Sequence, residues 1–166
     1  DEEVKPWISI YGDESISLLQ VDQSKVVLLN WDLEQFKGKS ADGAGQLELS
    51  TYNLFRRENS PKDFGMIRFC EIQNKDRNWP DNSSSYNDFA KSRKLNELIV
   101  SQCIYDTSVN HEKEGKTVIK ISQPVMQRLI NGESTGIAIL PLGLISATFY
   151  DENNKGLGPT LRFNVK

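Results

Sequence analysis

The residues best suited to catalysis are few and scattered. The chain has one histidine, His111, in the turn-like sequence NHEKEGK, and no serine or cysteine is placed to form a nucleophile–base pair with it. Glycoside hydrolysis needs two carboxylates at a set separation, which a sequence cannot measure. A lyase mechanism based on Tyr86 or His111 can be imagined, but nothing else in the sequence points to one. We therefore predict that the chain is not an enzyme.

Sugar binding is a second chemistry, and it uses flat aromatic faces together with forked hydrogen-bonding groups. Trp31 lies in an otherwise apolar run and is predicted to be buried. Trp79 fits a stacking surface and a structural anchor equally well. The candidates for stacking are Trp7, Tyr52, Trp79 and Tyr86.

Basic residues are concentrated between residues 56 and 94. This stretch holds nine lysines and arginines against six acids, and so carries +3 within a chain of net charge −3. Such an asymmetry could steer an acidic polysaccharide to one face, although mixed-charge loops are also ordinary solvated surface. The predicted ligand contacts are Arg56, Arg57, Arg77 and Trp79, followed by Tyr52 and Tyr86.

Metal binding is the third chemistry. The oxygen-rich segments GDES (12–15) and DENN (151–154) could hold calcium, but DENNKG also fits a hairpin turn, which we favour. A structural calcium ion remains open, while no ligands and no other cofactor are assigned. Cys70 and Cys103 lack the close spacing of a zinc or redox site. They could pair, but we expect buried thiols.

Length and composition predict one domain over residues 1–166, because 37% hydrophobic residues suffice for one core. The negative net charge argues against a nucleic-acid partner. The longest apolar run is interrupted by Pro141 and Gly143, so no transmembrane segment is predicted. The first residues, DEEVKPW, do not resemble an export leader, and we expect any such signal to have been removed or to belong to a larger precursor.

Short apolar-alternating runs separated by turn residues predict the elements that must carry these side chains. Few of the runs are long enough or have the period for a helix. We expect an all-β, jelly-roll-like sandwich with one short helix. The expected strands are 7–11, 15–21, 24–33, 44–55, 65–72, 99–109, 116–122, 136–140, 145–150 and 160–165, with a brief helical turn after the third.

The one expected helix spans residues 122–131. Ser122 is predicted to cap it, Pro124 falls in its first turn, and Gly132 follows its last residue. An apolar stripe is expected to pack on the core, and it comprises Val125, Met126, Leu129 and Ile130. This helix therefore closes the core, and binding is assigned to loops elsewhere.

Three segments resemble the DNRLRE-domain family, an alginate-binding class of carbohydrate-binding module. They are VVLLNWDLEQFKGKSADGAGQLEL (26–49), IKISQPVMQRLINGESTGIAILP (119–141) and SATFYDENNKGLGPTLRFNVK (146–166). The first resembles the family's strand, aromatic-Asp-Leu step and small loop; the second its helix followed by a short loop; the third its closing strands. The resemblance implies a non-catalytic sandwich that accompanies carbohydrate-active enzymes outside the cytoplasm.

We therefore predict a secreted or cell-surface carbohydrate-binding module that tethers an attached or associated catalytic domain to a polysaccharide. The acidic class of polysaccharide is the one that the basic stretch would favour. The alternative is a structural or interaction sandwich of a secreted or cell-surface protein, without a sugar site.

Overall fold

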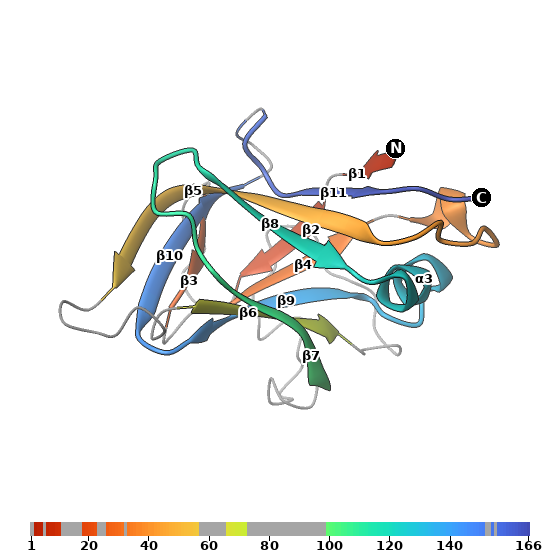
Figure 1. The fold of residues 1–166 in the computed structure, drawn as a ribbon, viewed down its shortest axis with the longest axis horizontal. Helices are drawn as coiled ribbons and strands as arrows, with labels where there is room; N and C mark the ends of the chain where they lie inside the picture. The colour runs from red at the N-terminus through yellow and green to blue at the C-terminus, as the bar shows by residue number, and fades with distance from the viewer. Residues whose placement is uncertain are drawn as a thin grey trace.

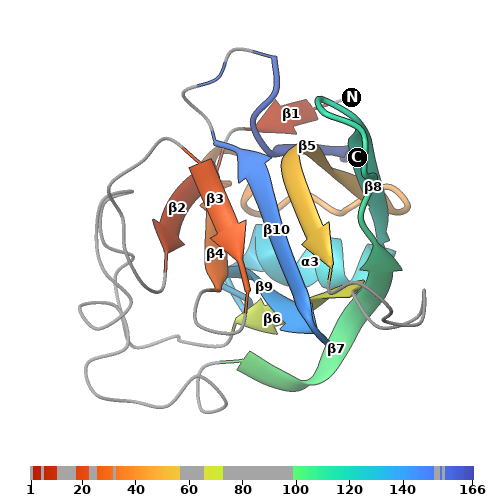
Figure 2. The same ribbon diagram turned by 90° about the vertical axis from the view of Figure 1, so that its left-hand side faces the viewer.

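The computed structural model describes residues 2–4, 6–10, 18–22, 26–31, 33–56, 66–72, 99–151, 154 and 156–166. These residues form two antiparallel sheets, one short α-helix and one 3-10 turn, η1 (Glu34–Phe36). Figures 1 and 2 show the two sheets as facing layers. The structure is the all-β sandwich with one short helix that the sequence predicts.

The six-stranded sheet is arranged around β5, the longest strand. Its order is β1 (Glu2–Val4), β11 (Thr160–Phe163), β5 (Gly45–Arg56), β10 (Ile145–Tyr150) and β3 (Leu18–Val21), and β8 (Lys116–Ile121) pairs with β5 as well. The five-stranded sheet has the order β2 (Pro6–Ile10), β4 (Val27–Trp31), β9 (Gly136–Leu142), β6 (Met66–Ile72) and β7 (Ile99–Ser108).

The strand pairs are nested like one long hairpin that has been rolled up. β3 pairs with β10, β4 with β9, β5 with β8 and β6 with β7, all antiparallel. Rolling places them in two sheets with the orders β3-β10-β5-β8 and β4-β9-β6-β7, which is the jelly-roll arrangement. Strands β1, β2 and β11 extend these two sheets. The jelly-roll prediction is confirmed.

All ten expected strands are present, and η1 occupies the place of the expected helical turn. The sequence prediction missed β1, because three residues with two glutamates show no apolar alternation. Strand β8 displays that alternation clearly, since every second residue is buried. Its inward side chains meet those of the other sheet, and its outward side chains face away from the core.

The core fills the space between the sheets with aliphatic and aromatic side chains. Phe69 and Phe149 are fully buried, and Trp31 is 5% exposed, which confirms its predicted core position. Burying each such large side chain contributes about 1.5–3 kcal/mol. This rigid interior fixes which side chains the strands present on their outer faces.

Helix α3 (Gln123–Asn131) covers one end of the core, at the right-hand end of the sandwich in Figure 1. Its predicted apolar stripe is buried, Pro124 lies in the first turn, and Gly132 ends the helix at φ 77°. The prediction that the Ser122 side chain caps the helix is wrong. Instead the Ser122 carbonyl oxygen accepts a hydrogen bond from the Met126 amide at 3.0 Å.

Polar side chains of α3 form hydrogen bonds to segments of both sheets. Gln127 Oε1 accepts a hydrogen bond from the Ala41 amide at 2.7 Å, in the segment that leads into β5. On the other flank, the Arg128 guanidinium donates two hydrogen bonds to Glu71 on β6, at 2.6 and 2.9 Å. The helix therefore joins the six-stranded sheet to the five-stranded sheet.

The expectation of buried free thiols is wrong. Cys70 is disulfide-bonded and fully buried, and Cys103, the only other cysteine in the chain, lies opposite it across the β6–β7 pair. Sequence spacing could not reveal this, because it is the strand register that brings two distant cysteines face to face.

Within the described residues, no helix has the length and apolar content needed to cross a bilayer.

Candidate functional site

Most of the predicted contact residues lie outside the described part of the chain. Arg57, Arg77, Trp79 and Tyr86 are among these, and of Arg56 only the backbone, at the end of β5, is described. Their assignment as ligand contacts stays a prediction. The structure does place the sixth, Tyr52, on the outer face of the six-stranded sheet.

Tyr52 lies on the outer face by simple alternation, because Leu47, Leu49 and Thr51 are the buried positions of β5. Strand β5 also bulges at Tyr52. Thr51 pairs with Phe149 and Asn53 pairs with Thr148, so Tyr52 is the extra residue between them. Thr51 is fully buried, whereas Tyr52 and Asn53 are both exposed, with Tyr52 40% exposed. A bulge of this kind re-aims side chains at the edge of a regular ladder. Here it leaves Tyr52 outward and turns Asn53 and Phe55 to the same face.

Two neighbours hold the Tyr52 ring. Tyr150 on β10 meets it edge to face, with 5.5 Å between ring centroids and an interplanar angle of 86°. The Lys113 ammonium lies 5.1 Å from the Tyr52 ring centroid, in cation–π geometry. We name these three residues the Tyr52 surface. It presents an oriented aromatic ring beside an exposed positive charge.

Lys113 belongs to the turn between β7 and β8, residues 110–115, which is hydrogen-bonded to β5 at Thr51. The Thr51 hydroxyl donates to the Asn110 carbonyl at 2.7 Å, and the Thr51 amide donates to the Gly115 carbonyl at 2.9 Å. The Glu114 amide donates back to the Thr51 carbonyl at 2.7 Å. One buried threonine therefore fixes the turn next to Tyr52.

The turn carries backbone strain at Glu114, which has a φ of 64°. Non-glycine residues adopt this left-handed conformation at a cost of roughly 1–2 kcal/mol. The strain is maintained by the hydrogen bonds to Thr51 and by the Asn110 side chain, which accepts from the Glu112 amide at 2.9 Å. Such strained, over-determined turns concentrate at functional sites.

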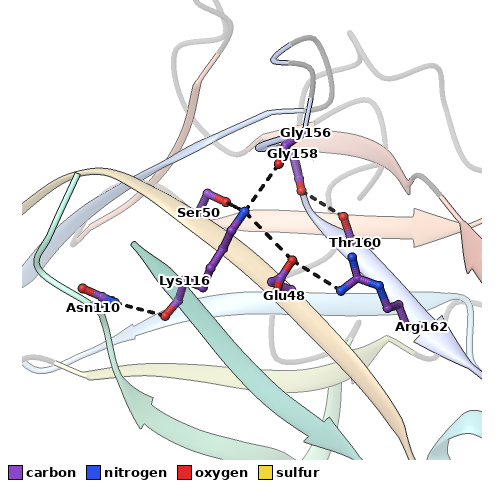
Figure 3. Close-up of polar contacts among 8 residues, drawn as sticks. All are labelled: Glu48, Ser50, Asn110, Lys116, Gly156, Gly158, Thr160 and Arg162. Atoms are coloured by element: carbon purple, nitrogen blue, oxygen red, sulfur yellow. Dashed lines mark hydrogen bonds and ion pairs between the residues drawn. The ribbon is translucent and has the colours of Figure 1, made fainter. Parts of the chain in front are cut away.

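Several polar side chains lie on the same outer face of β5 as Tyr52. Figure 3 shows their contacts around Lys116. The Lys116 ammonium donates to Ser50 Oγ at 2.6 Å and to the Gly156 carbonyl at 3.4 Å. Glu48 Oε2 lies 4.0 Å from that ammonium and 3.4 Å from the Arg162 guanidinium. We name Lys116, Ser50, Glu48 and Arg162 the Lys116 cluster. It holds two cations and one carboxylate in a fixed order across β8, β5 and β11.

The opposite end of the face is less charged. Phe55 on β5 is 69% exposed and lies opposite Ser146 of β10. Beside it, Gln20 Nε2 donates to Asp22 Oδ2 at 2.8 Å and to Ser146 Oγ at 3.5 Å. Along β5 the outer face therefore runs from charged groups, through an aromatic pair, to an exposed phenyl ring among hydroxyls and amides.

The metal hypotheses receive no support from geometry. Among the described residues, no three His, Cys, Asp or Glu side chains gather closely enough to hold a metal ion. The segment 12–15 lies outside the described residues. In segment 151–154, the Asn154 amide donates to the Asp151 carbonyl at 3.1 Å, and Gly156 has a φ of 79°, so the chain turns here. The turn is not the predicted hairpin, because the flanking strands β10 and β11 each pair with β5.

Two further ion pairs of the described structure connect elements of the sandwich. Burial raises the pKa of Glu71, but hydrogen bonds from Arg128 and Ser134 and the Arg128 charge outweigh it and hold that pKa below the usual value. Arg68 hydrogen-bonds to Asp106 at 2.8 and 2.9 Å and holds the pKa of Asp106 below its usual value. Both pairs connect neighbouring elements of the sandwich.

Sequence reasoning missed Tyr150, Lys113 and the Lys116 cluster. The outward positions of β8 follow from alternation, so Lys116 could have been placed on the outer face. The contact of Lys113 with Tyr52 could not, because it depends on a turn that is anchored by a distant strand.

No protein-family model matches the sequence, and no curated protein matches it either. The similarity to the DNRLRE-domain family stays a prediction.

Proposed function

We propose that this domain is a non-catalytic polysaccharide-binding module and that the Tyr52 surface is the centre of its binding face. The observation that carries the proposal is the exposed Tyr52 ring, held edge to face by Tyr150 within a face of ordered polar groups. A pyranose has an apolar face that can stack on such a ring, and hydroxyls that pair with surrounding donors and acceptors.

The neighbouring groups support the same function. Asn53 is exposed next to Tyr52, and Phe55 offers a second ring farther along β5. The Lys116 cluster adds donors that are already positioned by the fold. Contacts of this kind on an open face bind one sugar unit weakly, and a polymer engages several at once. The module would thereby keep an attached or associated catalytic domain near its substrate.

The disulfide of Cys70 supports a secreted or cell-surface location. Disulfides persist in oxidising compartments and are rare in the cytosol. The polysaccharide substrates of such tethered enzymes also occur outside the cytosol. The predicted contacts Arg56, Arg57, Arg77, Trp79 and Tyr86 would extend the binding face if they adjoin it.

Native affinity gels test the proposal. Gels would contain alginate, pectin, a heparin-like polymer or a neutral polysaccharide, each with and without a calcium chelator. We expect retardation of the wild-type domain in at least one gel and loss of most of it in Tyr52→Ala. The matched control is Tyr105→Ala, because Tyr105 is 48% exposed on β7 of the other sheet. Equal retardation of both variants would refute the Tyr52 surface as the site.

A structural or interaction module is the second candidate, and the exposed Phe55 favours it. A phenyl ring that is 69% exposed is suited to contact with another protein surface. This candidate expects no retardation in any gel and a loss of partner association in Phe55→Ser. The chelator arm separately tests whether a calcium ion contributes.

A further inference from the structure

We infer that Lys113 gives the Tyr52 surface a preference for carboxylate-bearing polysaccharides over neutral ones. The inference rests on the proposed function, and it assigns a selectivity role to one side chain. Its basis is the position of the Lys113 ammonium, 5.1 Å from the centroid of the ring on which a sugar would stack.

The position of Lys113 makes the charge of the sugar matter. A neutral sugar that stacks on the Tyr52 ring must compete with the ammonium for that ring, so the cation–π contact is lost. A sugar with a carboxylate can instead draw the ammonium into an ion pair while its ring stacks. The same side chain therefore opposes one ligand class and assists the other.

The turn is built in a way that keeps Lys113 at this place. Three hydrogen bonds join it to Thr51, the residue next to Tyr52 in β5. Glu114 holds a left-handed conformation to make one of them. The stem of the lysine can move, but its root is fixed relative to the ring. An ordinary solvated turn would need neither the strain nor these bonds.

Charges of both signs surround Lys113. Glu112 and Glu114 flank Lys113 along the turn and are exposed, whereas Lys116 and Arg162 lie farther along the face and share the Glu48 carboxylate. The two cations exceed that one carboxylate. Glu112, Lys113 and Glu114 together carry a net charge of −1, whereas the Lys116 cluster carries +1. The preference at the ring therefore comes from a direct ion pair with the Lys113 ammonium, and the cluster farther along β5 adds a net positive group.

The test compares acidic polymers with esters of the same polymers, in which the carboxylate charge is removed. Affinity gels would contain alginate, de-esterified pectin and the neutral esters of both. We expect wild-type retardation to be stronger with the acids. In Lys113→Met, which keeps the apolar stem, affinity for the acids should fall about five-fold, while affinity for the esters should stay unchanged or rise about two-fold. Lys113→Glu should reverse the preference.

The matched control is Lys120→Met, because Lys120 is exposed on the same face of β8. It removes the same net charge and should change the ratio of acid to ester affinity by less than about two-fold. An unchanged ratio in Lys113→Met, with binding that still depends on Tyr52, overturns the inference and leaves the proposed function standing. Absence of retardation of the wild-type domain in every gel overturns both.

Discussion

Two ionic sites in this molecule use similar residues for opposite purposes. At the junction of β6 and α3, Glu71 is 4% exposed and receives hydrogen bonds from Arg128 and Ser134. At the Tyr52 surface, the Lys113 ammonium faces an exposed ring and solvent. At the first site the Glu71 carboxylate is enclosed and paired, although the Arg128 side chain is 39% exposed, so this pair serves to hold the fold together. The second leaves its charge available, so it can respond to a ligand.

The difference lies in what happens when one member is lost. A buried carboxylate without its partner cannot regain water, so the cost falls on folding. An exposed lysine that loses its ring contact returns to water at little cost. Stability and binding should therefore respond to different substitutions.

The largest expected effect is on the enclosed site. Arg128→Met should lower the free energy of unfolding by about 2–4 kcal/mol, because it leaves the Glu71 carboxylate buried without its cation. Urea unfolding measures this. Arg68→Met at the exposed Arg68–Asp106 pair is the control and should cost less than about 1 kcal/mol. Equal losses in the two variants would contradict the distinction between enclosed and exposed pairs.

The enclosed site also predicts a pH dependence. The folded-state pKa of Glu71 lies below its ordinary value of 4.5, so the unfolded chain binds the proton more readily. Its contribution to stability is complete above about pH 4.5 and is lost as the pH falls through the lower folded-state pKa. Urea unfolding between pH 6 and pH 3 should show this loss. Glu71→Gln should flatten part of the profile, and Asp106→Asn a smaller part.

A smaller effect is expected at Thr51, which contributes both to the stability of the fold and to the position of Lys113. Thr51→Val removes the hydroxyl that donates to the Asn110 carbonyl and should cost about 1–2 kcal/mol. Because the turn then loses one of its bonds to β5, retardation by acidic polymers should weaken as well. Thr117→Val, which removes the hydroxyl that accepts from the Asn110 amide, is a comparison from the other side of the turn. A change in stability without any change in binding would show that the turn does not position Lys113.

The smallest effect has the opposite sign. Glu114→Gly should raise the free energy of unfolding by about 0.5–1 kcal/mol, because glycine adopts a φ of 64° without strain. Thermal unfolding would detect it as an upward shift in Tm. Glu112→Gly is the control and should not stabilise the domain. A loss of stability in Glu114→Gly would mean that the side chain itself contributes.

Much of the fold could be predicted from the sequence because its signals are local. Alternation marks strands such as β5 and β8, and Pro124 with Gly132 marks the limits of α3. The buried position of Trp31 follows from the apolar run that surrounds it. The predicted side-chain cap at Ser122 was wrong, because a serine that stands at the start of a helix need not use its hydroxyl as a cap.

The site could be predicted only in part, because it depends on long-range register. Tyr52 was recognised by type, and its outward position follows from the alternation of Leu47, Leu49 and Thr51, whereas the bulge that exposes Asn53 and Phe55 leaves no mark in the sequence. The approach of Lys113 needs the pairing of β5 with β8, and the cysteine link needs the pairing of β6 with β7. Local patterns do not encode these alignments.

The disulfide between β6 and β7 also alters the covalent topology of the chain. With Cys70 linked to the only other cysteine, Cys103, residues 71–102 become the arc of a closed ring. A protease that cuts once within this arc opens the ring but releases no fragment, since the disulfide still joins the two pieces. A nicked molecule would therefore keep its full mass on a non-reducing gel and separate into two chains only after reduction.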